Sequence, residues 1–172
     1  MSIDPMLQPL AFSLIPAQRC SRMKCLLAIL AMLFATSVFA TSVANKSLED
    51  IVRSADYVVV ANIERVDMVD GRGRAVTNPK ARTGPGLDNQ IRFHLRVKKA
   101  LFARSGAVPP TLAVPLWTAW HYNLGTMQEE ASKNDSIFLL KGDHYEPAYP
   151  AHFERSMDER AEIERILADK GK

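Results

Sequence analysis

The clearest pattern in the chain is a strict alternation of apolar and polar residues over positions 91–98. Its apolar members are Ile91, Phe93, Leu95 and Val97. Successive side chains of a strand point to opposite faces, so this alternation predicts a strand with one face in the core. Residues 55–63 are instead mostly apolar and β-branched, in a run too short for a buried helix. That run predicts a central strand that continues toward Val66.

Two further apolar segments predict strands in the second half of the chain. Pro109 and Pro110 precede the segment 111–117, in which Pro115 lacks an amide donor and therefore indicates an edge strand or a bulge. Residues 136–141 form a short apolar run of the kind found in buried strands. The Gly-Asp pair that follows predicts a turn and a hairpin with residues 144–149.

Helices are expected near both ends of this set of strands. Ser47 is followed by acidic residues and by an apolar stripe, which predicts a capped helix that ends near Ser54. Ser156 and Glu159 match a capping box ahead of a second helix. The apolar face of that second helix comprises Ile163, Ile166 and Leu167.

The order of the expected elements determines the expected fold class. Between Asp70 and Asp88 the chain has four glycines and two prolines, which predicts a long loop, and residues 118–133 are also expected to be a loop. Strands and helices do not alternate regularly, which argues against a doubly wound parallel sheet. We predict a mainly β fold, a small antiparallel OB-like β-barrel of about five strands with short N-terminal and C-terminal helices.

The core pattern also resembles a known family. The segments that carry the likeness are SLEDIV at 47–52, ADYVVV at 55–60, VKKAL at 97–101 and IFLL at 137–140. They are similar to segments of a family of secreted bacterial small β-barrel (OB-like) domains of unassigned function. The chain departs from that pattern at Ala61, where glycine is usual. The resemblance implies the fold, and it implies no catalytic residue.

The N-terminal segment has the features of a secretory signal peptide. Lys24 precedes an apolar run over residues 25–35, and small side chains at Val38 and Ala40 suit signal peptidase. We expect cleavage after Ala40, so that residues 1–40 are an upstream segment and signal and residues 41–172 are a single β-barrel domain. The apolar run is too short for a membrane anchor. We therefore expect a periplasmic or secreted protein with no membrane attachment after cleavage.

Cleavage changes the chemistry available to the mature chain. Both cysteines, Cys20 and Cys25, leave with the signal, which excludes a thiol nucleophile and cysteine-ligated zinc. Residues 1–40 contain three of the 22 basic residues and one of the 19 acidic residues, so the net charge falls from +3 to +1. Export and this small charge argue against a nucleic-acid partner.

No catalytic motif is found in the mature sequence. It lacks the Gly-x-Ser-x-Gly elbow of hydrolases and the His-Glu-x-x-His motif of metalloproteases. We expect no enzyme activity, no cofactor and no metal site. The alternative metal site would use His144 and His152, with Asp143 as a third ligand.

Aromatic side chains gather in one short stretch that contains both tryptophans of the chain. Trp120, His121 and Tyr122 are candidate partner-binding residues, because exposed aromatic side chains bury a large area at little entropic cost. We expect Trp117 to close the bottom of the barrel.

Basic residues supply a second candidate feature. Nine basic residues and one acidic residue lie within 71–128, and alternation places Arg92, Arg96 and Lys98 on the outer face of their strand. These three can form a basic partner-binding face, or they can pair with the acidic C-terminal helix. We expect an exported, non-enzymatic binding protein, most simply an inhibitor or immunity protein for a toxin or enzyme of the cell envelope. The alternative is a module that binds glycan or cell wall.

Overall fold

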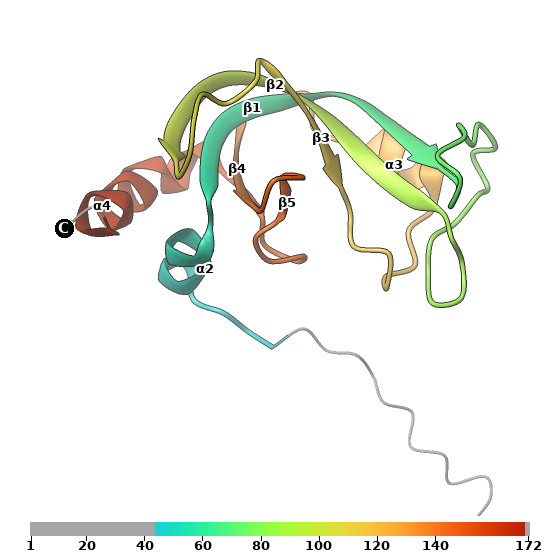
Figure 1. Ribbon diagram of the computed structural model, residues 1–172, viewed down its shortest axis with the longest axis horizontal. Coiled ribbons are helices and arrows are strands. Elements are labelled where there is room, and N and C mark those ends of the chain that lie inside the picture. The colour runs from blue at the N-terminus through green and yellow to red at the C-terminus, as the bar shows by residue number, and fades with distance from the viewer. Residues whose placement is uncertain (1–43, 171–172) are drawn as a thin grey trace, which may run out of the picture. The chain divides into compact units, whose positions relative to one another are not determined.

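The computed structural model describes residues 44–170, so the expected signal peptide lies outside the described residues. The described chain folds as one antiparallel sheet accompanied by short helices (Figure 1). In chain order the elements are α2 (Leu48–Ser54), β1 (Tyr57–Val69), β2 (Gln90–Ala103), β3 (Thr111–Pro115), α3 (Leu124–Glu130), β4 (Ser136–Lys141), β5 (Glu146–Pro147), β6 (Glu154–Arg155), a 3₁₀ turn (Met157–Glu159) and α4 (Arg160–Lys170). The mainly β class and the terminal helices are confirmed.

The six strands follow the order β3-β2-β1-β4-β5, with β6 paired to β4. β1 and β2 form the long central hairpin, and its register shifts at three places, for example between Ile63 and Arg65. Such bulges increase local bending, and Figure 1 shows the hairpin arched over the rest of the sheet. Among the described residues no hydrogen-bonded ladder joins β3 to β5, so the sheet is not closed into a barrel.

Two prolines explain why no ladder forms where β3 and β5 meet, a line of contact that we call the seam. The amide of Leu116 donates to the carbonyl of Ile91 (2.8 Å). Backbone groups of successive strand residues point to opposite sides, so those of the preceding residue, Pro115, point away from β2. On β5 the amide of Ala148 donates to Leu139 (2.9 Å), so Pro147 likewise directs its backbone away from β4. β3 and β5 lie in contact, yet each presents a proline without a donor at their shared seam.

The sheet has an apolar core on each face. Side chains of β1 alternate between them: Val59 and Ala61 belong to the core enclosed by the curved sheet, whereas Val58 and Val60 belong to the core beneath the helices. Because both faces of β1 are buried, its sequence is a nearly continuous apolar run rather than an alternating one.

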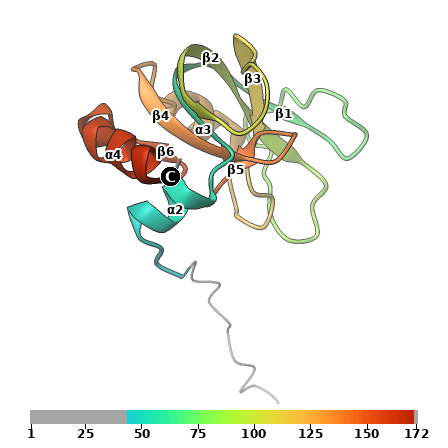
Figure 2. The same cartoon turned by 60° about the vertical axis from the view of Figure 1, so that its left-hand side comes forward.

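The two terminal helices cover the second core, as Figure 2 shows for α2 and α4. The side chain of Ser47 accepts a hydrogen bond from the amide of Asp50 (3.1 Å), which confirms the expected N-cap of α2. Ile163 and Ile166 of α4 are fully buried, which confirms the predicted apolar face. The ammonium of Lys170 donates to the carbonyl of Ala55 (2.6 Å) and links the end of α4 to the C-cap of α2.

Two elements were not expected from the sequence. The predicted loop 118–133 contains α3, which begins after the N-cap Asn123 and buries only Leu124 completely. A seven-residue helix that includes glycine and has one buried position leaves no apolar periodicity to detect. The strand β6 has only two residues, too few to show any alternation. Within residues 44–170, no helix has the length and apolarity needed to span a membrane.

Candidate functional site

Three aromatic rings form a continuous series where the chain leaves β3. The ring centroids of Trp117 and Trp120 are 5.8 Å apart, and those of Trp120 and Tyr122 are 6.0 Å apart. Both pairs are tilted, at 59° and 55°, an arrangement that aromatic pairs favour. We call Trp117, Trp120 and Tyr122 the aromatic ladder. The three residues are close in the sequence, and the structure shows that their rings contact one another in chain order.

The aromatic ladder is held in place by a side chain 37 residues earlier in the sequence. The Oγ1 of Thr83, a residue only 1% exposed, donates to the carbonyl of Trp120 (2.6 Å) and accepts from the amide of Tyr122 (3.1 Å). The amide of Thr83 also donates to the carbonyl of Tyr122 (3.0 Å). One threonine therefore satisfies polar backbone groups on both sides of His121.

The loop between β1 and β2 is attached to the candidate site along several residues. The amide of Leu124 donates to the carbonyl of Ala81 (3.0 Å), and the amide of Gly125 donates to that of Pro79 (2.9 Å). Gly84 has a φ of +148°, and a Cβ at this position would overlap with the imidazole of His121. The positive φ therefore favours glycine where the loop passes over His121.

Exposure along the aromatic ladder reverses one expectation. Trp117 was expected to close the bottom of a barrel, but its side chain is 39% exposed at the seam between β3 and β5. Trp120 and Tyr122 are half-buried, and His121 is exposed. Trp117 is therefore the most accessible ring of the series, because the chain has already left the sheet when it reaches this residue.

Desolvation should alter the titration of Tyr122. Burial raises the pKa of its phenol from 10.0 to about 12, because the phenolate would lose hydration. Since the pKa is higher in the folded protein than in the unfolded chain, the stability it contributes is present below pH 10 and is lost as pH rises through about 12. In an absorbance titration of phenolate, Tyr122→Phe should remove the component with the highest pKa. Loss of a component near pH 10 instead would contradict this assignment.

The three basic candidates lie on β2, and two of them are neutralised by β1. Arg92 donates through Nε and Nη2 to the two carboxylate oxygens of Asp67, both at 2.9 Å. Arg96 forms an ion pair with Glu64. Lys98 is exposed, and no ion pair with it is found among residues 44–170. The ion-pair partners of Arg92 and Arg96 thus lie on β1. The predicted alternative, in which these two side chains pair with the C-terminal helix, is wrong.

Asp67 is the centre of this polar cluster. Its Oδ2 also accepts from Nε2 of His94 (2.8 Å) and from Arg65 (3.3 Å). Burial alone would raise the pKa of Asp67, but the hydrogen bonds from Arg92 and His94 outweigh burial and hold it below the ordinary value. The carboxylate of Asp67 therefore joins β1 to β2 through its hydrogen bonds with Arg92 and His94.

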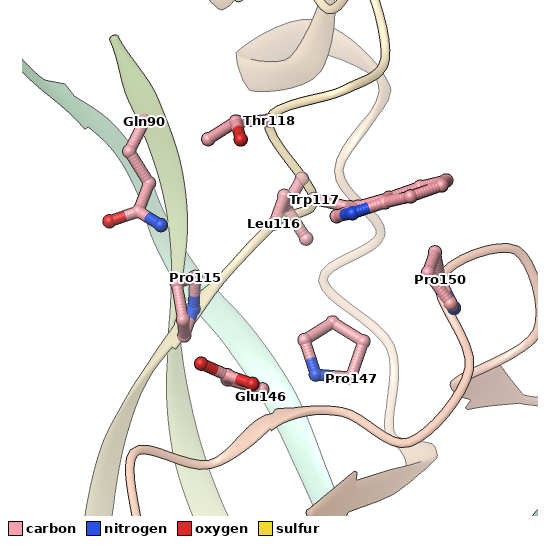
Figure 3. A pocket seen from close by; sticks show the side chains of 8 residues that line it. All are labelled: Gln90, Pro115, Leu116, Trp117, Thr118, Glu146, Pro147 and Pro150. Atoms are coloured by element: carbon pink, nitrogen blue, oxygen red, sulfur yellow. The ribbon is translucent and has the colours of Figure 1, made fainter. Parts of the chain in front are cut away.

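A hollow of about 240 Å³ opens beside Trp117, at the seam between β3 and β5 (Figure 3). Three prolines contribute to its walls: Pro115, Pro147 and Pro150. Gln90 and Thr118 lie at one end of the hollow and Glu146 lies at the other. We call this feature the seam hollow. Sequence reasoning found none of its polar residues, since they come from three separate segments that carry no shared motif.

The metal alternative gains no support from the described part of the chain. Residues 44–170 contain no group of three or more His, Cys, Asp or Glu side chains placed to hold a metal ion. His144 is exposed, and His152 stacks on the ring of Tyr149 at a centroid distance of 6.1 Å.

Comparisons with protein-family models, with curated proteins and with solved structures find no match to this chain.

Proposed function

We propose that this chain is an exported, non-enzymatic binding protein whose partner is a protein of the cell envelope. An inhibitor or immunity protein that blocks a toxin or an envelope enzyme is the specific form of this proposal. The signal-like segment before residue 41 supports a periplasmic or secreted location. The absence of catalytic motifs from the sequence supports binding without turnover.

The observation that carries the proposal is the aromatic ladder on a prearranged loop. Trp and Tyr are the residue types that dominate binding energy at protein interfaces. The hydrogen bonds of Thr83 hold the backbone of Trp120 and Tyr122 before any partner arrives. A prearranged surface loses less conformational entropy on binding, so more of the contact energy appears as affinity.

Charged residues of β2 supply the second part of the proposed interface. Arg96 and Lys98 are exposed, and Arg92 is half-buried in its bidentate pair with Asp67. Exposed charges of this kind contribute more to the rate of association and to partner choice than to affinity. We assign the aromatic ladder and His121 to the centre of the interface and the three basic side chains to its rim.

The finer fold assignment also belongs to this proposal. An OB fold is a five-stranded, partly open barrel. Joining β3 to β5 would close the observed strand order into such a barrel, and the prolines at the seam account for the missing ladder. We propose that the sheet is an open version of an OB-like barrel, in line with its resemblance to the secreted β-barrel family.

Affinity capture from envelope extract tests the proposed function. With the purified protein as bait we expect one specific protein partner, and Trp117→Ala or the double variant Trp120→Ala, Tyr122→Ala should weaken its affinity by about thirtyfold, equivalent to about 2 kcal/mol. Leu87→Ala is the matched control, because Leu87 is an exposed apolar side chain outside the aromatic ladder. Equal capture by all baits, each verified as folded by circular dichroism, would refute the proposal.

A second candidate function is binding of glycan or cell wall. The observation that favours it is the exposed ring of Trp117 beside the amide of Gln90 and the hydroxyl of Thr118, since sugars stack on aromatic faces and hydrogen-bond to such groups. Sedimentation with purified peptidoglycan distinguishes the two candidates. Retention on peptidoglycan that depends on Trp117, without any protein partner, would favour the glycan function.

A further inference from the structure

The seam hollow lies between two strands that cannot extend the sheet toward each other. Along the seam edge of β3 the outward backbone positions are Thr111, Ala113 and Pro115, and the last of these has no amide hydrogen. The facing edge of β5 has Pro147. Strand addition requires a row of free donors and acceptors, so prolines disfavour an added strand beside the hollow. A single inserted side chain needs no such row.

The polar groups of the hollow lie at its two ends. Figure 3 shows Gln90 and Thr118 at one end, the proline rings with Leu116 and Trp117 between, and Glu146 at the far end. A neutral sugar stacked on Trp117 could reach Gln90 and Thr118, but it has no charge to pair with the carboxylate of Glu146. A long basic side chain has polar groups only at its two ends and an apolar stem between them.

The charge of the hollow also favours a cation. Glu146 is the one charged residue among the eight that line it, and its side chain makes no ion pair within the described residues. Lys141 lies opposite Glu146 in the β4–β5 ladder, but no ion pair joins them. Arg92, the next outward residue of β2 after Gln90, is already bound by Asp67.

From these observations we infer that the seam hollow receives one arginine or lysine side chain of the protein partner. The cationic head pairs with the carboxylate of Glu146, and the stem lies against the proline rings and Trp117. The partner's backbone at that residue hydrogen-bonds to Gln90 and Thr118. A volume of about 240 Å³ suits one side chain, since it lies below the range of about 300–1,000 Å³ found for drug-sized ligands. This inference rests on the proposed protein-binding function and names the residue type that the partner presents.

Small peptide probes test the inference without the natural partner. Binding of the capped tripeptide Gly-Arg-Gly to the purified protein is followed by NMR, through the indole N–H of Trp117 and the amide signals around the hollow. The matched probe replaces arginine with citrulline, which has nearly the same shape and no charge. We expect the arginine probe to bind about fivefold more tightly than the citrulline probe and to shift the signal of Trp117.

The variant Glu146→Gln should abolish the difference in affinity between the two probes. The matched control is Glu162→Gln, because Glu162 is an exposed residue of α4 outside the hollow. This control should leave the difference in affinity unchanged. Equal binding of both probes, no shift at the hollow at millimolar concentration, or displacement of the arginine probe by a cell-wall oligosaccharide would each overturn the inference. Partner capture that depends on the aromatic ladder but not on Glu146 would leave the proposed function standing while refuting this inference.

Discussion

Replacing Phe138 by alanine is expected to lower the free energy of unfolding by about 3–5 kcal/mol, the largest loss we predict for a single substitution. Phe138 is fully buried on β4, and its ring lies 6.1 Å from that of Phe153. The surrounding sheet is hydrogen-bonded on both sides of β4 and cannot collapse into the cavity that alanine would leave. Urea denaturation followed by far-ultraviolet circular dichroism measures the loss.

Phe138→Leu is the control, because it removes less volume and keeps an apolar side chain. Its cost should be about 1.5 kcal/mol or less. A loss below about 1 kcal/mol for the alanine variant would contradict a tightly packed core at this position. Such a result would also weaken the argument that the curved sheet encloses a single inner core with Phe93 and Phe153.

Thr83→Val is expected to cost about 1–3 kcal/mol, since valine keeps the shape of threonine but removes its hydroxyl. The carbonyl of Trp120 and the amide of Tyr122 would each lose the stronger of two hydrogen bonds and keep only the longer one between themselves (3.2 Å). We further expect the aromatic ladder to become mobile. Chemical denaturation measures the stability, and hydrogen exchange of residues 117–123 measures the local opening.

Thr83→Ser serves as the matched control because it keeps the hydroxyl, and it should retain most of the protection from exchange. If valine leaves both stability and exchange unchanged, the loop after β3 must be held by other contacts. Partner capture with the Thr83→Val bait links this prediction to function. Prearrangement by Thr83 predicts weaker capture even though every ring of the aromatic ladder is still present.

The candidate site and the seam hollow share Trp117, and both depend on the way the sheet ends. The chain turns away from β2 after Leu116, which is buried, and Trp117 is left at the seam with its ring partly exposed. A ladder between β3 and β5 would occupy that seam. The missing ladder thus removes stability from the sheet edge and provides the accessible surface on which the proposed interface is built.

Local sequence patterns predicted the elements whose cause is local. The alternation at 91–97 identified β2, and Ser47 identified the start of α2, because side-chain periodicity and capping each act within a few residues. Short elements escaped detection: α3 has one fully buried residue, and β6 has two residues in all. For such elements the packing against distant strands supplies the stability that the local sequence lacks.

The candidate site was predicted only in part, for the same reason. Trp120, His121 and Tyr122 are neighbours in the sequence, so their proximity required no fold. Thr83 and Gly84 come from the loop between β1 and β2, and nothing in their surroundings signals a role at the site. The exposure of Trp117 was predicted incorrectly, because an aromatic residue after a strand carries no information about whether another strand covers it.

The sequence by itself determined the mainly antiparallel β class, the N-cap of α2 and the apolar faces of the strands, since these follow from propensity and periodicity over short distances. Only the tertiary structure decided that the sheet stays open, that Asp67 and Glu64 neutralise Arg92 and Arg96, and that Glu146 lines a hollow beside Trp117. Each of these depends on residues from separate segments that meet only when the hairpins pack, and side chains at such distances leave no joint pattern in a single chain.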